Sequence, residues 1–194
     1  MPISQNDGTI SFCRLVIPLQ DFQALLRKHR ATDPKTPDIE AQARALVACG
    51  FAAGVPEFVR AVCGWGGYSG VAGRVTKNNS PEKILAALRD ASACLRDDDA
   101  RAGLQSLLGL SGLGISFASK HLKFLDPERA VVLDSVISGH LGYLPSCDGY
   151  MEFLADCHDL RRRVVGANVA YPFPNEGAWR VSDIEMAIFA RLRA

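Results

Sequence analysis

Residues 110–118 read Leu-Ser-Gly-Leu-Gly-Ile-Ser-Phe-Ala and lie between two segments with the apolar spacing of helices. Gly112 and Gly114 predict a tight turn there, because glycine adopts backbone conformations that residues with a Cβ avoid. The sequence therefore predicts a helical hairpin over about residues 104–125. A glycine turn that merely joins two packed helices gives the same pattern, so the hairpin alone does not identify a function.

The predicted turn also offers a way to hold a phosphate. The helix that follows it begins with backbone amides that have no partner within the helix, at the positive end of the helix dipole. We therefore expect Gly112, Leu113, Gly114 and Ser116 to contact a DNA backbone. Such contacts do not depend on base sequence, and they need no excess of basic residues, which suits a chain with a net charge of +1.

An aspartate follows this hairpin in the sequence at a spacing that bears on function. Asp134 follows the second hairpin glycine by twenty residues and ends the apolar run of residues 130–133, while Ala118 is small enough to let two helices cross closely. Together these features resemble the helix-hairpin-helix DNA glycosylase superfamily, most sharply its 8-oxoguanine DNA glycosylase-like branch. Residues 62–75 resemble the elbow that enters the opened duplex in this family, and residues 179–192 resemble its C-terminal helix.

The resemblance implies both a fold and an activity. The implied fold is all-α and two-lobed, with the base pocket between the lobes and residues 1–194 forming a single domain. The implied activity is DNA repair: a monomer flips a damaged purine, 8-oxoguanine first, out of double-stranded DNA and excises it. A non-catalytic helix-hairpin-helix module that binds DNA or a protein is an alternative, as is a glycosylase for another modified base.

Two residues near the hairpin are candidates for catalysis. Excision leaves positive charge on the sugar, which a nearby carboxylate stabilises, and the resemblance assigns this role to Asp134. The same carboxylate could cap the helix that follows it. Family members that also cleave the strand form a Schiff base through a lysine at a position where this chain has Ser116. Lys120, one turn along the same face, is the expected replacement; a solvent-facing lysine is the alternative, and the one expected for Lys123.

The candidates for base recognition lie in the C-terminal segment and in a glycine-rich elbow. Glu185 and Phe189 share a helical face and resemble the family's pair of an amide that reads the base and a ring that stacks on it. An ionised glutamate would only accept hydrogen bonds. The alternative role for Glu185 is a capping box with Ser182. Trp65 and Tyr68 are candidates for filling the gap left by the flipped base, and Trp65 could instead pack in the core.

The rest of the chain also has the pattern of helices. Apolar residues recur at helical spacing, and proline or serine stands at several expected helix starts. The expected helices cover residues 17–30, 39–49, 55–63, 81–95, 102–108, 115–125, 135–141, 148–164 and 181–192. Loops are expected at residues 31–37, 64–73 and 96–101, and the one candidate strand lies within residues 3–12.

Composition excludes several other classes. Hydrophobic residues make up 48% and charged residues 22% of the chain, as in folded proteins. No apolar run reaches the roughly 18 residues that span a bilayer, and the N-terminus lacks the pattern of a secretion signal. We therefore expect no membrane partner and a cytoplasmic location, at the nucleoid in a bacterium. The run Arg161-Arg162-Arg163 could contact phosphates or form a solvated face.

Cysteine spacing argues against a metal centre. The six cysteines include no Cys-x-x-Cys pair, so the spacing of zinc and iron–sulfur sites is missing. We expect free, mostly buried thiols. No cofactor and no catalytic metal are expected, although a structural monovalent cation at the hairpin is compatible with the pattern.

Overall fold

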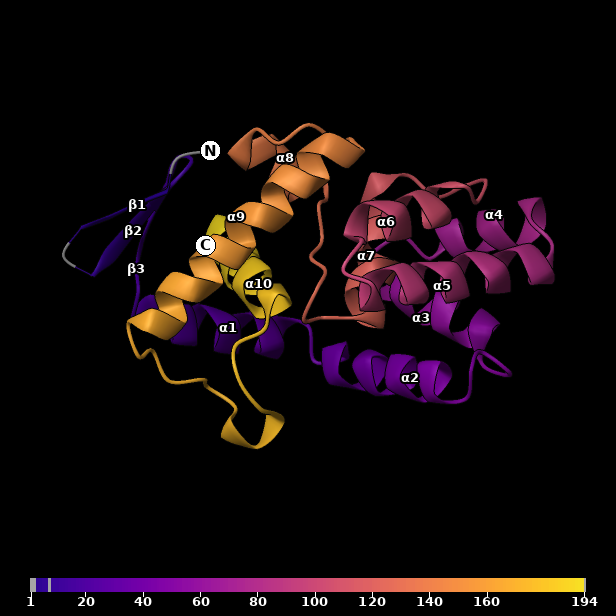
Figure 1. The fold of residues 1–194 in the computed structure, drawn as a ribbon, viewed down its shortest axis with the longest axis horizontal. Helices are drawn as coiled ribbons and strands as arrows, with labels where there is room; N and C mark the ends of the chain where they lie inside the picture. The colour runs from indigo at the N-terminus through magenta and orange to yellow at the C-terminus, as the bar shows by residue number, and fades with distance from the viewer. Residues whose placement is uncertain (1–2, 7, 194) are drawn as a thin grey trace.

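The computed structural model describes residues 3–6 and 8–193, and it is mostly helical with one small sheet (Figure 1). The strands are β1 (Ile3–Asn6), β2 (Thr9–Phe12) and β3 (Leu15–Pro18), antiparallel in the order β1-β2-β3. The helices are α1 (Asp21–Thr32), α2 (Thr36–Ala48), α3 (Val55–Trp65), α4 (Gly70–Asn78), α5 (Pro81–Arg96), α6 (Ala100–Leu108), α7 (Ile115–Leu125), α8 (Ser135–Leu141), α9 (Cys147–Gly166) and α10 (Val181–Leu192), with a 3-10 turn, η1 (Pro174–Glu176). The expected helical fold with a strand near its start is confirmed.

The helices form two groups, which Figure 1 shows on either side of the chain segment 126–134. The central lobe comprises α2 to α7, in which α5 packs on α6 and both α2 and α3 pack on α7. The terminal lobe comprises the sheet, α1, α8, α9 and α10, with α1 packed along α10. The two ends of the chain therefore build one lobe, and the segment between α7 and α8 passes from one lobe to the other.

The third strand corrects the helix expected from residue 17. In β3, buried Ile17 is flanked by exposed Val16, which is the period of two that a strand produces. Ile17 pairs with buried Ile10 of β2. The helix α1 therefore begins at Asp21 rather than Ile17.

The glycine-rich segment 64–73 contains a helix start that its composition hides. The helix α4 begins at Gly70 and buries Val71, Ala72 and Val75. Glycine weakens a helix by roughly 0.5–1 kcal/mol relative to alanine, and burial of three apolar side chains offsets that cost. Tertiary packing, which composition does not reveal, therefore decides this element.

Two of the expected loops are shorter than predicted. The helix α1 extends to Thr32 and α2 begins at Thr36, so only residues 33–35 remain of the loop expected over 31–37. Pro37 lies in the first turn of α2, where its missing N–H costs no hydrogen bond. The turn expected over residues 96–101 ends at Asp99, whose side chain caps α6.

The structure bears on two expectations, one about the cysteines and one about membrane-spanning helices. All six thiols are free, as expected. The expectation that most are buried is wrong, because only Cys63 and Cys157 are buried, while Cys49 is exposed at the end of α2. None of the helices in the described part of the chain is both long and apolar enough to cross a membrane.

Candidate functional site

A cavity of about 380 Å³ lies where the two lobes meet, within the roughly 300–1,000 Å³ typical of small-molecule sites. Its walls come from α1, the turn after α3, α7, the start of α8, and α10. Six of the predicted site residues line it: Trp65, Ser116, Lys120, Asp134, Glu185 and Phe189. Gly112, Leu113, Gly114 and Tyr68 are not part of this lining.

Lys120 and Asp134 form a partly shielded ion pair on the wall of the cavity. Lys120 is 4% exposed, and its Nζ lies 3.4 Å from Oδ2 of Asp134 and donates to Oγ of Ser116 at 3.0 Å. Burial lowers the pKa of the Lys120 amine, and the carboxylate of Asp134 opposes this shift without cancelling it. The amine therefore loses its proton more readily than an exposed lysine does.

Asp134 caps a helix and faces the cavity at the same time. Its Oδ1 accepts hydrogen bonds from the amides of Val136 (3.0 Å) and Ile137 (3.1 Å), which caps α8. Its Oδ2 remains for Lys120. The amide of Leu133 donates to Oγ of Ser119 at 3.1 Å. This hydrogen bond joins the segment before Asp134 to α7. The capping and cavity roles considered from the sequence therefore coexist.

Gly66, in the turn after α3, leaves space for the lysine. A Cβ at this position would lie 2.7 Å from Cε1 of Phe117 and 3.0 Å from Cδ of Lys120. A larger residue would therefore displace either the ring or the lysine chain. The glycine-rich elbow contributes to the site through this close approach.

Glu185 is buried beside the cavity with an unused carboxyl oxygen. It is 2% exposed, and its Oε2 has no hydrogen-bond partner among the described residues. Burial, reinforced by the charge of Asp134 and opposed by Lys123 and Lys120, raises the pKa of Glu185 to about 8. A neutral carboxyl offers one donor and one acceptor, as a side-chain amide does. The raised pKa therefore favours the form of Glu185 that can donate as well as accept, rather than the ionised form that only accepts.

The capping box proposed for Ser182 and Glu185 is wrong. The N-cap of α10 is Arg180, whose amide donates to Oδ2 of Asp183 at 2.9 Å. Ser182 is buried, and its Oγ has no partner within the described residues. The N-cap therefore lies two residues before Ser182, and the carboxylate that completes the capping box belongs to Asp183 rather than Glu185.

His29 of α1 is a site residue that the sequence reasoning missed. It is buried, and its ring lies edge-on to Phe189 with centroids 5.9 Å apart. Its Nε2 lies 3.7 Å from Oδ2 of Asp33, and its Nδ1 has no partner among the described residues. Burial, with nearby positive charges, lowers the pKa of His29 to about 3. A signal existed, since Phe22, Leu26 and His29 form the buried stripe of α1.

The two elbow aromatics have different environments. Nε1 of Trp65 donates to Oγ1 of Thr36 at 3.0 Å, and the ring packs edge-on against Phe124 at 5.0 Å. These contacts favour the packed alternative for Trp65, as part of the cavity wall. Tyr68 is 60% exposed, with the guanidinium of Arg74 5.5 Å from its ring centroid. Of the two rings, that of Tyr68 is therefore the one accessible from outside the protein.

The turn between α6 and α7 is fixed against α4. Gly112 has φ +102°, and a Cβ there would lie 3.3 Å from Cβ of Arg74 and 3.4 Å from the amide nitrogen of Val75. The side-chain amide of Asn79 donates to the carbonyl of Ser111 at 2.9 Å and accepts from its N–H at 3.0 Å. This position therefore requires glycine for two reasons: its φ is positive, and the backbone of α4 lies too close to leave room for a side chain.

The start of α7 presents backbone rather than side chains. Gly114 is the N-cap and makes no side-chain cap hydrogen bond, so the first amides of α7 are capped by no side chain of their own N-cap residue. Gly112 and Gly114 are exposed, whereas the side chain of Leu113 is 8% exposed. Contacts from Leu113 to a phosphate would therefore use its backbone, while Ser116 is turned toward Lys120 inside the cavity.

The expectation for Lys123 needs correction, whereas both alternatives for the arginine run stay open. Lys123 is fully buried rather than solvent-facing, with its Nζ 3.1 Å from Oε1 of Glu40. Because this partner is 83 residues away in the chain, no local sequence pattern predicts the ion pair. The arginine run is partly exposed, with the Arg162 side chain 70% exposed, and all three side chains also make contacts within the protein. Arg161 donates to the carbonyl of Trp179, and its two successors bond to Asp159.

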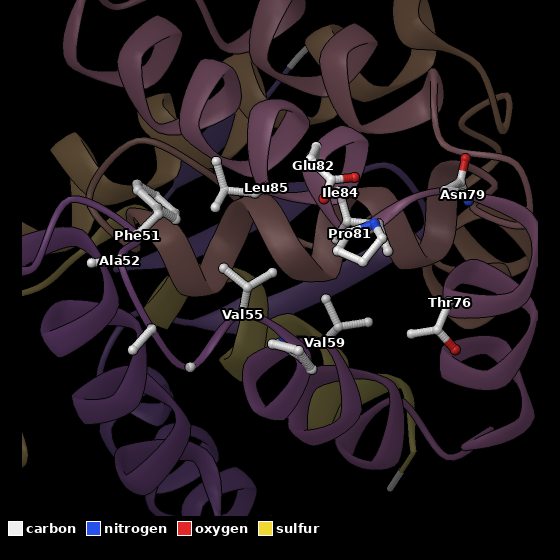
Figure 2. Close-up of a pocket in the computed structure, with 13 residues that line it drawn as sticks. Phe51, Ala52, Val55, Val59, Thr76, Asn79, Pro81, Glu82, Ile84 and Leu85 are labelled. Carbon is white, nitrogen blue, oxygen red and sulfur yellow. The ribbon is translucent and has the colours of Figure 1, made fainter.

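A second cavity, of about 280 Å³, lies among α3, α4, α5 and the loop before α3 (Figure 2). Its wall is largely apolar and includes Val55, Val59, Ile84 and Leu85. The single ionisable side chain in its described lining is Glu82, which is exposed. Of these two cavities, the inter-lobe cavity is therefore the one whose described lining holds groups capable of acid–base and nucleophilic chemistry.

Comparisons with protein-family models, curated proteins and solved structures found no match to this chain. The described residues include no group of three or more histidine, cysteine, aspartate or glutamate side chains placed to hold a metal ion. The features of the protein that bear on its function are therefore the side chains of the inter-lobe cavity.

Proposed function

We propose that this protein is a DNA glycosylase of the helix-hairpin-helix type, with its catalytic cavity between the two lobes. The observation that carries the proposal is the buried pair of Lys120 and Asp134, 3.4 Å apart on the cavity wall. A buried amine with a lowered pKa beside a carboxylate is typical of a nucleophilic site. The glycine turn that precedes α7 supplies a backbone surface for phosphate on the same helix.

The side chains support excision with Schiff-base formation. After losing its proton, the amine of Lys120 attacks C1′ of the deoxyribose as the bond from C1′ to the base nitrogen breaks, and the bonding electrons leave with the base. Asp134 stabilises the positive charge that develops on the sugar. The proton released from the attacking amine neutralises the departing base. The lone pair of the attached nitrogen then opens the sugar ring: the C1′–O4′ bond breaks, O4′ takes up a proton from solvent, and a protonated imine joins Lys120 to C1′. This imine acidifies the hydrogens on C2′, and loss of one of them as a proton eliminates the 3′ phosphate.

The base would be held between polar groups and an aromatic ring. Phe189 offers a stacking face, while the neutral carboxyl of Glu185 offers a donor and an acceptor. The donor of Glu185 would pair with a carbonyl on the base edge, and its acceptor with a neighbouring N–H. Guanine and 8-oxoguanine both have such an edge. The neutral imidazole of His29 adds one donor and one acceptor. An oxidised purine such as 8-oxoguanine is therefore the first substrate to test, and Tyr68 is the candidate for filling the vacated stack.

Borohydride trapping tests the proposal. Duplex DNA carrying 8-oxoguanine opposite cytosine is incubated with the protein and sodium borohydride, which reduces an imine to a stable covalent adduct. We expect an adduct for the wild type and for Lys83→Gln, an exposed control on α5, and none for Lys120→Gln. Excision without trapping would indicate a monofunctional enzyme in which Asp134 activates water. Duplex binding without excision of any damaged base would refute the enzyme and favour a non-catalytic DNA-binding module.

A further inference from the structure

Four buried charged side chains connect the two lobes behind the cavity. Glu40 of α2 and Lys123 of α7 belong to the central lobe, whereas Arg180 and Asp183 stand at the start of α10 in the terminal lobe. We propose that this group, the ionic clasp, consists of positioning residues that set the base-contacting face of α10 against the nucleophile on α7. The inference rests on the proposed function, since it concerns the geometry of that same site.

The clasp is continuous and balanced in charge. Nζ of Lys123 lies 3.1 Å from Oε1 of Glu40, and Oε2 of Glu40 lies 2.7 Å from Nη1 of Arg180. Nη2 of Arg180 lies 2.9 Å from Oδ1 of Asp183. None of the four side chains is more than 12% exposed. Burial alone would raise the pKa of Glu40, but the charges of Lys123 and Arg180 outweigh it and hold this pKa at about 2.

The position of the clasp connects it to the site. Lys123 follows Lys120 by three residues on α7, and Glu185 follows Asp183 by two on α10. The Nζ of Lys123 also lies 5.6 Å from the ring centroid of Trp65, which forms part of the cavity wall. A displacement at the clasp would therefore reach both the nucleophile and the base-contacting carboxyl.

Stability is a weak explanation for such a group. Desolvation of buried charges offsets most of their attraction, and apolar replacements of similar volume are often no less stable. Charge-assisted hydrogen bonds do fix direction, because two oxygens of one carboxylate must meet two donors at defined angles. Glu40 meets donors from both lobes in this way. The group is therefore suited to fixing relative position, and a misplacement of about 1 Å can reduce catalysis by about 10²-fold.

The test compares a step that needs the base with one that does not. In Glu40→Gln/Lys123→Met both charges of one pair are removed together, so neither is left buried alone, and Arg180 keeps Asp183. We expect single-turnover excision of 8-oxoguanine at saturating protein to fall at least tenfold. We expect the Kd for a duplex with a tetrahydrofuran abasic-site analogue to stay within twofold of the wild type, because this ligand has no base to align.

A matched control breaks an exposed inter-lobe ion pair. Arg101 of α6 and Asp148 of α9 are 2.7 Å apart and 44% and 80% exposed, so Arg101→Met should change neither measurement. If the double variant does not fold, Glu40→Asp keeps the charges but shortens one side chain, and it should lower excision at least threefold with Kd unchanged. Parallel losses in both measurements, or no loss in either, would overturn the clasp. A wild type that excises no base would instead refute the proposed function.

Discussion

The carboxyl of Glu185 offers a test that needs no DNA. Its pKa rises from an ordinary 4.5 to about 8 because the side chain is buried. Between these values the folded state holds a proton that the unfolded state has lost. The free energy of unfolding must then fall as the pH rises through this window. Glu185→Gln keeps the shape and hydrogen-bonding groups of the neutral carboxyl but has no proton to lose, so it should lose this dependence.

The expected magnitude follows from the two pKa values. Each pKa unit corresponds to about 1.36 kcal/mol, so moving a pKa from 4.5 to about 8 is linked to at most about 5 kcal/mol. The full difference between Glu185→Gln and the wild type is reached only at pH 8 and above. Near pH 4.5 the two proteins should be equally stable. Because solvent relaxation reduces such shifts, a change of about 2–5 kcal/mol across this range is expected.

Urea unfolding at pH 5, 6, 7, 8 and 9 measures the effect. Glu152→Gln, at an exposed position of α9, serves as the control and should give a curve parallel to that of the wild type. Glu185→Gln should gain stability over the wild type steadily up to about pH 8. A difference that is constant with pH would refute a neutral buried carboxyl. With DNA, Glu185→Gln should still excise 8-oxoguanine above pH 8, where the wild type loses its donor.

Three further substitutions probe the site and the hairpin. Asp134→Asn should lower single-turnover excision at least 10²-fold, with the duplex affinity measured by fluorescence anisotropy nearly unchanged because asparagine also caps helices. Gly66→Ala should lower borohydride trapping at least tenfold with duplex affinity intact, because the new Cβ would collide with Phe117 and displace Lys120. Gly112→Ala should lower the free energy of unfolding in urea by about 1–3 kcal/mol and weaken duplex binding in fluorescence anisotropy, since its φ is +102°.

Sequence reasoning succeeded where the signal was local. Apolar spacing, Ser80 as a cap and proline at helix starts predicted most helices, and Ser80 does accept from the amide of Lys83. The spacing along α7 placed Lys120 one turn from Ser116, and the structure joins them by a hydrogen bond of 3.0 Å. Periodicity within one helix is enough for such statements, because helical geometry fixes which residues share a face.

Non-local contacts account for what was missed. In the sequence, nothing distinguishes Lys123 from an exposed lysine on a helix. Its burial depends on Glu40, which is 83 residues away in the chain. Glu185 has the spacing of a capping residue with Ser182, but the helix start is instead closed by Arg180 and Asp183. The protonation states depend on burial, which no spacing reveals. Sequence therefore predicted six of the residues that line the cavity but missed His29, and the shifts in pKa follow only from the packed structure.

The inter-lobe cavity concentrates features that oppose stability. Lys120 and His29 have lowered pKa values and Glu185 a raised one, and for all three the largest cause is burial. Each shift means that burial makes the charged form of the group less favourable in the cavity than in water, which is a cost to any state that holds the charge there. A purely structural core would have little reason to retain three of them around one hollow, together with unpaired nitrogen and oxygen atoms. A polar ligand that forms hydrogen bonds with the unpaired atoms, as a flipped base would, explains why the protein retains these groups despite their cost.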